Sequence, residues 1–179
     1  QPRSRGLGDV YKRQINLSFV QIVKSNIVKD VLENIERYSA ANNHYVFEIT
    51  ETIEMDQIPA VQNVFKEFVK NEFRFAIDDF GTGYSNYGYM RDRTFDIVKV
   101  DRSFVTDIDK LKDNYLMVSF IIKMAHEMGL HVCIEGVETK EELSCVKKLG
   151  ADYIQGYYYG KPVCLQDFEE QHLKRFVLG

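Results

Sequence analysis

Short apolar runs alternate with longer amphipathic segments along most of the chain. Five runs rich in β-branched and aromatic residues predict buried strands, namely HYVFEIT at 44–50, RFAIDDF at 74–80, FDIVKVD at 95–101, HVCIEGV at 131–137 and DYIQGYYY at 152–159. Apolar residues recur at helical spacing over 61–69, 116–128 and 143–149, and an earlier helix is expected at about 18–42. This alternation predicts a parallel sheet with helical crossovers, either a doubly wound sheet or a (β/α)8 barrel.

Local signals mark several ends of these helices. Gly129 and Gly150 follow helical segments, where a residue without a side chain can end the helix in the left-handed conformation. Thr139 precedes Glu142 by three residues, which is the spacing of a capping box at a helix start. The helix predicted over 143–149 is therefore expected to run between Thr139 and Gly150.

Nearly every predicted strand ends its apolar run on an acid, an amide or a lysine. These positions are Asn16, Glu48, Asp78 with Asp79, Lys99 with Asp101, Glu135 with Glu138, and Gln155. A doubly wound sheet gathers its ligand site at one switch point, whereas a barrel turns the carboxyl ends of all its strands toward one centre. Because so many strands carry a polar residue at this end, the pattern favours the barrel.

The polar residues at the strand ends are rich in carboxylates. Several carboxylates that share one mouth raise one another's pKa values unless cations neutralise them. Oxygen ligands without supporting His or Cys suit Mg²⁺, Mn²⁺ or Ca²⁺ rather than zinc. The adjacent acids Asp78 and Asp79 are therefore expected to straddle metal ions, with Gly81 and Gly83 letting the following loop pass close to them.

Composition narrows the class of protein. The chain has 179 residues, 45% of them hydrophobic, and a formal net charge of −4, which fits one globular domain and gives no basic field for polymeric nucleic acid. The cysteines Cys133, Cys145 and Cys164 lie among apolar residues without CxxC spacing, so reduced thiols in a cytosolic setting are expected. No transmembrane segment or signal peptide is predicted.

The order of six segments resembles the EAL-domain family, bacterial phosphodiesterases that linearise the signalling dinucleotide cyclic di-GMP. The segments are INLS, FEITET, IDDFGTGYSNYGYM, FDIVKVDRSFV, IEGVET and GADYIQGYYYGKPV, and the resemblance covers residues 15 to about 163. It implies a (β/α)8-type barrel with two Mg²⁺ or Mn²⁺ ions at its mouth. A metal pair can activate water and stabilise charge on the phosphoryl oxygens, so no histidine base is required.

The resemblance also implies a role for individual residues. Asn16, Glu48 and Asp78 match ligands of one metal, and Asp78, Asp79 and Glu135 match ligands of the other. Lys99 and Gln155 match residues that hold the hydrolytic water and the reacting phosphate, with Glu138 supporting them. Glu51 matches a glutamate that tethers the loop beginning at Asp79, and Asp101 is expected to orient its neighbours.

Two alternatives stay open at the level of single residues. Lys99 could act on the phosphate, or it could simply pair with Asp101 or Glu135. The tyrosines at 157–159 could offer a stacking face for guanine or could pack against the protein.

The resemblance extends to partners and location. It implies cyclic di-GMP as substrate, a homodimer in the full-length parent, fusion to upstream sensor or GGDEF-type modules, and a cytoplasmic domain whose parent could be membrane-anchored through upstream segments. The alternative is a catalytically inactive EAL-type domain that acts as a cyclic di-GMP receptor or protein-interaction module. The retained acids argue against that alternative, because a receptor does not need a full metal set.

The amino-terminal segment departs from the family pattern. The name-giving Glu-Ala-Leu strand does not precede Asn16, and 179 residues fall short of the roughly 250 typical of a complete barrel. We therefore expect an incomplete barrel that lacks its first strand and helix. Residues 1–14 are expected to be a non-native leader, and residues 15–179 the partial barrel domain.

Overall fold

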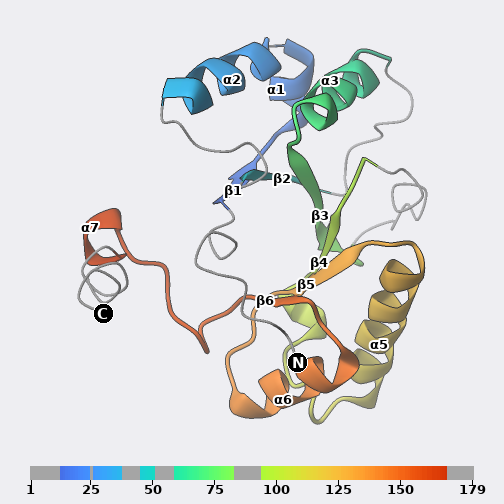
Figure 1. Cartoon of the computed structure of the whole chain (residues 1–179). Helices are drawn as coiled ribbons and strands as arrows, with labels where there is room; N and C mark the ends of the chain where they lie inside the picture. Colours follow the sequence, from blue (N-terminus) through green and yellow to red (C-terminus); the bar gives the residue numbers. More distant parts are fainter. Residues whose placement is uncertain (1–12, 25, 38–44, 51–58, 83–93, 169–179) are drawn as a thin grey trace.

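A computed structural model describes residues 13–24, 26–37, 45–50, 59–82 and 94–168. One parallel sheet of six strands forms its centre (Figure 1). The strands are β1 (Arg13–Asn16), β2 (Tyr45–Thr50), β3 (Arg74–Phe80), β4 (Ile97–Val100), β5 (His131–Ile134) and β6 (Tyr153–Ile154).

Helices connect and follow these strands. They are α1 (Phe19–Lys24), α2 (Ile27–Arg37), α3 (Pro59–Lys70), the short 3₁₀ helix η4 (Arg102–Phe104), α5 (Lys112–Glu127), α6 (Lys140–Leu149) and α7 (Leu165–Phe168). Among the described helices, none combines the length and the apolar character that crossing a bilayer requires.

The strands lie in the sheet in the same order as in the sequence, and every neighbouring pair is parallel. The order never reverses, so the described sheet has no switch point of the doubly wound kind. The α/β class is confirmed, and the curled, singly wound sheet brings the carboxyl ends of all six strands to one edge.

The two faces of the sheet are packed differently. One face carries Phe47, Phe75 and Val98 into a large core with helices α3, α5 and α6. Aromatic rings interlock there, with centroids 4.8 Å apart for Phe47 and Phe68. The opposite face carries a small apolar layer of Val46, Ala76, Ile97 and Cys133, with Tyr153 packed against it. Side chains alternate between the two faces along each strand. The residues two positions beyond the small apolar layer therefore determine the chemistry of the second face.

The observed elements agree with most of the predicted boundaries. The strands predicted at 44–50 and 74–80 are present, whereas only two residues of the segment 152–159 form a strand. There the chain turns after Gln155, and the Tyr158 N–H donates to the Val137 carbonyl over 3.0 Å. In the described part of the range 18–42, where one helix was expected, there are two helices, α1 and α2, and residues 25 and 38–42 lie outside the described residues.

The start of the described chain and the cysteines can also be compared with expectation, and Cys164 is the cysteine that differs from the expected core thiol. Strand β1 begins at Arg13, inside the segment expected to be a leader, and its guanidinium donates to the Tyr45 hydroxyl over 2.9 Å. Cys133 is a buried free thiol whose pKa is raised to about 12 by burial, which fits the expected core thiol. Cys164 is exposed, because it lies in the irregular segment beyond β6.

Helix α6 has the predicted ends. The Glu142 N–H donates to Thr139 Oγ1 over 3.2 Å and the Thr139 N–H donates back to Glu142 Oε2 over 3.0 Å, which completes the capping box. Gly150 ends the helix with a φ of 90°, a left-handed conformation that glycine adopts without strain. Both sequence signals are therefore confirmed.

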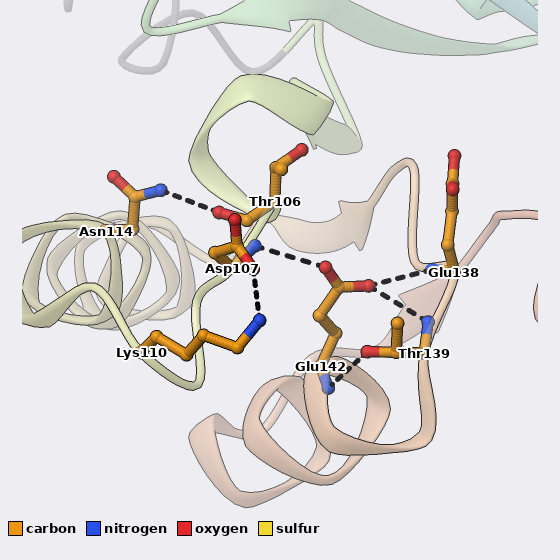
Figure 2. A network of polar contacts seen from close by, with 7 residues as sticks. All are labelled: Thr106, Asp107, Lys110, Asn114, Glu138, Thr139 and Glu142. Carbon is orange, nitrogen blue, oxygen red and sulfur yellow. Dashed lines mark hydrogen bonds and ion pairs between the residues drawn. The ribbon is translucent and has the colours of Figure 1, made fainter.

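Glu142 reaches further than its own helix, as Figure 2 shows. Its Oε2 also accepts from the Glu138 N–H over 2.9 Å, and its Oε1 accepts from the Asp107 N–H over 3.2 Å. Burial alone would raise the pKa of this carboxyl, but the N–H groups of Glu138, Thr139 and Asp107 outweigh it and lower the pKa below its ordinary value. One buried carboxylate thus joins the segment after β4 to the segment after β5.

Glu142→Gln is expected to reduce the free energy of unfolding by about 1 kcal/mol near neutral pH. The NH₂ group of glutamine would lie against the Asp107 N–H, so two donors would meet and one hydrogen bond would be lost. The lowered pKa means that the wild-type advantage is complete above the ordinary carboxyl pKa and is lost as pH falls through the folded-state pKa. Urea denaturation should therefore show two curves that converge in acid. Glu141→Gln, an exposed neighbour, is the matched control, and a difference that is constant with pH would contradict this interpretation.

Candidate active site

Polar residues follow the small apolar layer on the second face of the sheet. Each lies two positions beyond an apolar residue of its own strand, so its side chain leaves the same face. The pairs are Val46 and Glu48, Ala76 and Asp78, Ile97 and Lys99, and Cys133 and Glu135. A charged layer therefore lies above an apolar one, at the carboxyl edge of the sheet.

Lys99 lies at the centre of the charged layer. Its Nζ is 2.8 Å from Glu48 Oε1, 2.9 Å from Asp78 Oδ1 and 2.8 Å from Glu135 Oε1, and the residue is only 4% exposed. Burial lowers the pKa of the ammonium group, but the close carboxylates of Glu135, Glu48 and Asp78 outweigh it and raise the pKa above its ordinary value. The ion pair between Lys99 and Glu135 that the sequence suggested is thus observed.

The carboxylates around Lys99 are not fully satisfied by it. Burial raises the pKa values of Glu48 and Glu135, and the contact with Lys99 only partly offsets the effect. Among the described residues, no well-aligned hydrogen bond reaches Glu48 Oε1 or Asp78 Oδ1, although both oxygens lie close to the ammonium. Buried anionic oxygens of this kind are able to accept a further cation beside the ammonium.

A bulge in β3 places Asp79 on the same side as Asp78. The register advances by three residues on β3, from Ile77 to Phe80, against two on β4, from Val98 to Val100. Asp79 has a φ of 53°, a left-handed conformation that aspartate tolerates better than most residues. Adjacent strand residues normally point to opposite faces, so this extra residue is what brings the two carboxylates together.

The loop after the bulge passes close to the next segment. Gly81 has a φ of 96°, and a Cβ at this position would lie 2.9 Å from the Phe104 ring. Glycine is therefore required here both for its conformation and for its lack of a side chain. Gly81 thus lies close to Phe104, whereas the expected passage of the loop near Asp78 and Asp79 concerns residues from Gly83 onward, which lie outside the described residues.

Asp78, Asp79 and Glu135 form a group that fits a divalent cation. One carboxylate oxygen from each lies within 4.8 Å of the others. Partial burial and the Asp78 carboxylate raise the pKa of Asp79, as expected of crowded acids. The donor set is entirely oxygen, which suits Mg²⁺ or Mn²⁺. The buried oxygens without aligned hydrogen bonds support the same interpretation.

The remaining predicted residues lie at different distances from this group. Asn16 is directly opposite Glu48 in the ladder between β1 and β2, so it borders the charged layer. Gln155 follows β6, and its N–H donates to the Ile134 carbonyl over 2.8 Å. Glu51 lies outside the described residues.

Two predicted residues make contacts that the sequence did not indicate. Asp101 caps η4, and its Oδ1 accepts from the Ser103 N–H over 2.9 Å. Glu138 faces Arg102, with 3.9 Å between Oε1 and the guanidinium, and within the described part of the chain the ion pairs of Lys99 do not include Glu138. Arg102 was missed although it directly follows Asp101, because an exposed arginine after a strand carries no pattern of its own.

A pocket of about 670 Å³ opens beside the charged layer. It is lined by Arg102, Gly136, Glu138, Gln155, Gly156, Tyr157, Tyr159, Gly160, Lys161, Pro162 and Val163. The pocket therefore combines two basic groups, one acid, one amide and two tyrosines next to the carboxylates that fit a divalent cation. Such a mixture is typical of a site for a polar ligand with aromatic parts.

Gly156→Ala is expected to destabilise the protein by about 1–3 kcal/mol and to displace Gln155, because a Cβ would overlap the Val137 backbone. Gly160→Ala is the matched control, since nothing lies within 4 Å of a Cβ there. Thermal unfolding of both variants checks the prediction. Equal melting temperatures for the two variants would show that the close approach at Gly156 is unimportant.

Comparison with known proteins gives one consistent result. The model of the EAL domain matches residues 2–162. The probable cyclic di-GMP phosphodiesterase PdeA of Escherichia coli strain K12 is 34% identical over 86% of this chain and 21% of its own length. The chain thus spans about a fifth of that relative.

Solved structures agree. The EAL enzyme Bd1971, in its cAMP- and cyclic-di-GMP-bound form, has 34% identity and a TM-score of 0.82 over 88% of this chain and 42% of that one. Klebsiella pneumoniae BlrP1, in a complex with manganese and cyclic di-GMP, has 26% identity and a TM-score of 0.74 over 84% of this chain and 39% of that one. Both neighbours thus bind a cyclic dinucleotide, and one of them also binds a divalent metal.

Proposed function

The chain belongs to the EAL domain family, and from this premise we propose that it is the phosphodiesterase part of its protein, hydrolysing cyclic di-GMP to the linear dinucleotide pGpG with divalent metal ions. The relative PdeA is named a probable cyclic di-GMP phosphodiesterase, and the structure of Bd1971 contains cyclic di-GMP. These names support the substrate, and the chemistry is argued from the residues of this chain.

The observation that carries the proposal is the charged layer. Glu48, Asp78 and Glu135 surround Lys99, and the β3 bulge adds Asp79 to the same edge. Gathering four carboxylates and one buried ammonium at the carboxyl ends of parallel strands lowers the stability of the fold, because charges must leave water. Stability alone therefore does not explain the arrangement. Their arrangement suits binding of cations and a phosphate at the position where barrel enzymes hold their substrates.

We assign two metal positions to these residues. Asn16, Glu48 and Asp78 would hold one Mg²⁺ or Mn²⁺ ion, and Asp78, Asp79 and Glu135 would hold the other. Such a pair supplies an activated water and stabilises charge on the phosphoryl oxygens. The manganese complex of BlrP1 supports the use of a divalent metal.

The residues of this chain contribute orientation and charge. Lys99 is ion-paired on three sides, so it offers a fixed positive charge rather than a free amine base. Gln155 presents an amide at the mouth of the pocket, where it can donate to a phosphoryl oxygen or accept from water. Asp101 holds η4 in place through its cap and thus supports the segment that follows Lys99.

The wider architecture belongs to the same proposal. We propose that the singly wound sheet is part of a (β/α)8 barrel, that the full-length parent forms a homodimer, and that sensor or GGDEF-type modules precede this domain. The domain itself is proposed to work in the cytoplasm. MucR of Pseudomonas aeruginosa, which is 30% identical over 83% of this chain, is named a bifunctional diguanylate cyclase and phosphodiesterase, which supports such a fusion.

Turnover of cyclic di-GMP with different metals tests the proposed function. The protein expressed from its intact locus should produce pGpG with Mg²⁺ or Mn²⁺, detected by chromatography, and Ca²⁺ should support binding without turnover because its geometry is looser. Tight binding of cyclic di-GMP without conversion in any of these metals would instead identify a receptor.

A further inference from the structure

Glu142 is a buried acid that the proposed chemistry does not use. In the described part of the chain, the buried charged residues are Glu48, Lys99 and Glu142, and the first two belong to the charged layer. Glu142 lies in the first turn of α6 and is only 6% exposed. A buried carboxylate is costly unless its oxygens are hydrogen-bonded, so the groups that Glu142 contacts indicate its role.

One oxygen of Glu142 holds the end of the segment that follows β5. Its Oε2 accepts from the Glu138 N–H over 2.9 Å and from the Thr139 N–H over 3.0 Å. Figure 2 shows both contacts, with the Glu138 side chain directed away from them. Without this oxygen, two N–H groups at the start of α6 would lose an acceptor, and the backbone there would have to shift to find another.

The same segment carries a carboxylate of the charged layer. Residues 135–138 start at Glu135, whose N–H donates to the Val100 carbonyl over 3.1 Å. The chain then turns at Gly136, which has a φ of 73°. A Cβ at Gly136 would overlap the Arg102 Cβ, so this turn is packed against its neighbour and has little room to absorb a shift. A displacement at Glu138 is therefore transmitted to Glu135.

The other oxygen of Glu142 rests on a segment that is itself firmly held. Its Oε1 accepts from the Asp107 N–H over 3.2 Å. Asp107 has a φ of 56°, and its Oδ1 lies 2.6 Å from the Lys110 Nζ. Asn114 of α5 donates to the Thr106 carbonyl over 3.1 Å. Glu142 thus joins the segment after β5 to one that is anchored on α5 (Figure 2).

We infer that Glu142 is a positioning residue of the proposed metal site. The length of its side chain sets where residues 135–138 lie, and thereby where the Glu135 carboxylate can meet a metal ion. The inference rests on the proposed function, since it assumes that Glu135 is a metal ligand. The role requires an acceptor at the correct distance rather than a negative charge, so an amide of the same length should fill it.

Titration of Mn²⁺ into variants of Glu142, followed by calorimetry, tests this role without requiring turnover. Glu142→Met keeps the length and removes both acceptors, and it is expected to weaken Mn²⁺ binding about tenfold, as losses of groups that orient a metal ligand do. Glu142→Asp keeps the charge but is one CH₂ group shorter, so binding should weaken about threefold. Glu142→Gln keeps the length and one acceptor oxygen for the Glu138 and Thr139 N–H groups, and should bind Mn²⁺ as the wild-type protein does.

Leu143→Ala separates positioning from stability. Leu143 is the buried neighbour of Glu142 on α6, so its truncation destabilises the protein without removing an acceptor. The folded Leu143→Ala variant should bind Mn²⁺ as the wild-type protein does. Circular dichroism shows which variants fold, and the comparison of Glu142→Asp with Glu142→Gln decides the question if Glu142→Met does not.

The outcomes separate this inference from the proposed function. The expected order of Mn²⁺ affinities, without pGpG formation by the wild-type protein, would support the positioning role and contradict the phosphodiesterase activity. Turnover by the wild-type protein, with unchanged Mn²⁺ affinity in Glu142→Asp and Glu142→Met, would do the reverse. An equal loss of affinity in Leu143→Ala and Glu142→Met, or in Glu142→Gln and Glu142→Asp, would also overturn the positioning role, because side-chain length and acceptor would then not matter.

Discussion

Replacing Asp78 by asparagine is expected to lower kcat for cyclic di-GMP hydrolysis by about a thousandfold or more. The reason is that the metal ions, which would stabilise negative charge in the transition state, would lose a shared carboxylate ligand. Asp78 belongs both to the ring around Lys99 and to the oxygen group with Asp79 and Glu135. Asparagine preserves the volume and removes the charge, so folding should survive while Mn²⁺ affinity falls.

Steady-state kinetics and a Mn²⁺ titration on the same variant check this expectation. Asp109→Asn removes an exposed aspartate outside the charged layer and serves as the control. Wild-type kcat in Asp78→Asn would show that Asp78 does not take part in the reaction. Wild-type Mn²⁺ affinity would show that Asp78 is not a metal ligand.

Lys99→Met is expected to reduce the free energy of unfolding by roughly 3–5 kcal/mol, because removing one partner leaves buried charges uncompensated. Three carboxylates lie within 2.9 Å of the Lys99 ammonium, and methionine offers none of them a positive charge. Mn²⁺ should restore part of the lost stability, since a divalent cation can supply the missing charge to the same oxygens.

Urea denaturation with and without Mn²⁺ measures both effects. Lys123→Met, at an exposed position of α5, controls for the change of residue type. A similar loss of stability in the two variants would show that the ion pairs of Lys99 contribute little. A loss at Lys99 that Mn²⁺ leaves unchanged would show that metal and ammonium do not share these carboxylates.

Five of the six described strands, their parallel order and the edge that carries the site could be predicted from the sequence, whereas β1 was not among the predicted strand runs. Buried parallel strands leave a near-continuous apolar run, and each run ended on a polar residue such as Glu48, Lys99 or Glu135. The ends of α6 could be predicted from Thr139 and Gly150, because the capping interactions involve backbone groups only a few residues away.

Other features depend on contacts between distant segments and left no readable pattern. The bulge that turns Asp79 toward Asp78 is set by the register between β3 and β4, which alternation within one strand does not show. The Asp107 N–H reaches Glu142 across 35 positions of sequence, and Glu138 meets Arg102 only because the segments after β4 and β5 pack together. Such pairings are fixed by tertiary packing rather than by local spacing.

Parallel measurement of bound Mn²⁺ and of pGpG formation, on one sample of the protein expressed from its intact locus, tests the central claim most directly. The account predicts that turnover of cyclic di-GMP rises with Mn²⁺ occupancy and reaches its maximum when two ions are bound per chain. Saturation with Mn²⁺ without any pGpG, or turnover that persists after the metal is removed by a chelator, would contradict a metal-dependent phosphodiesterase at these carboxylates.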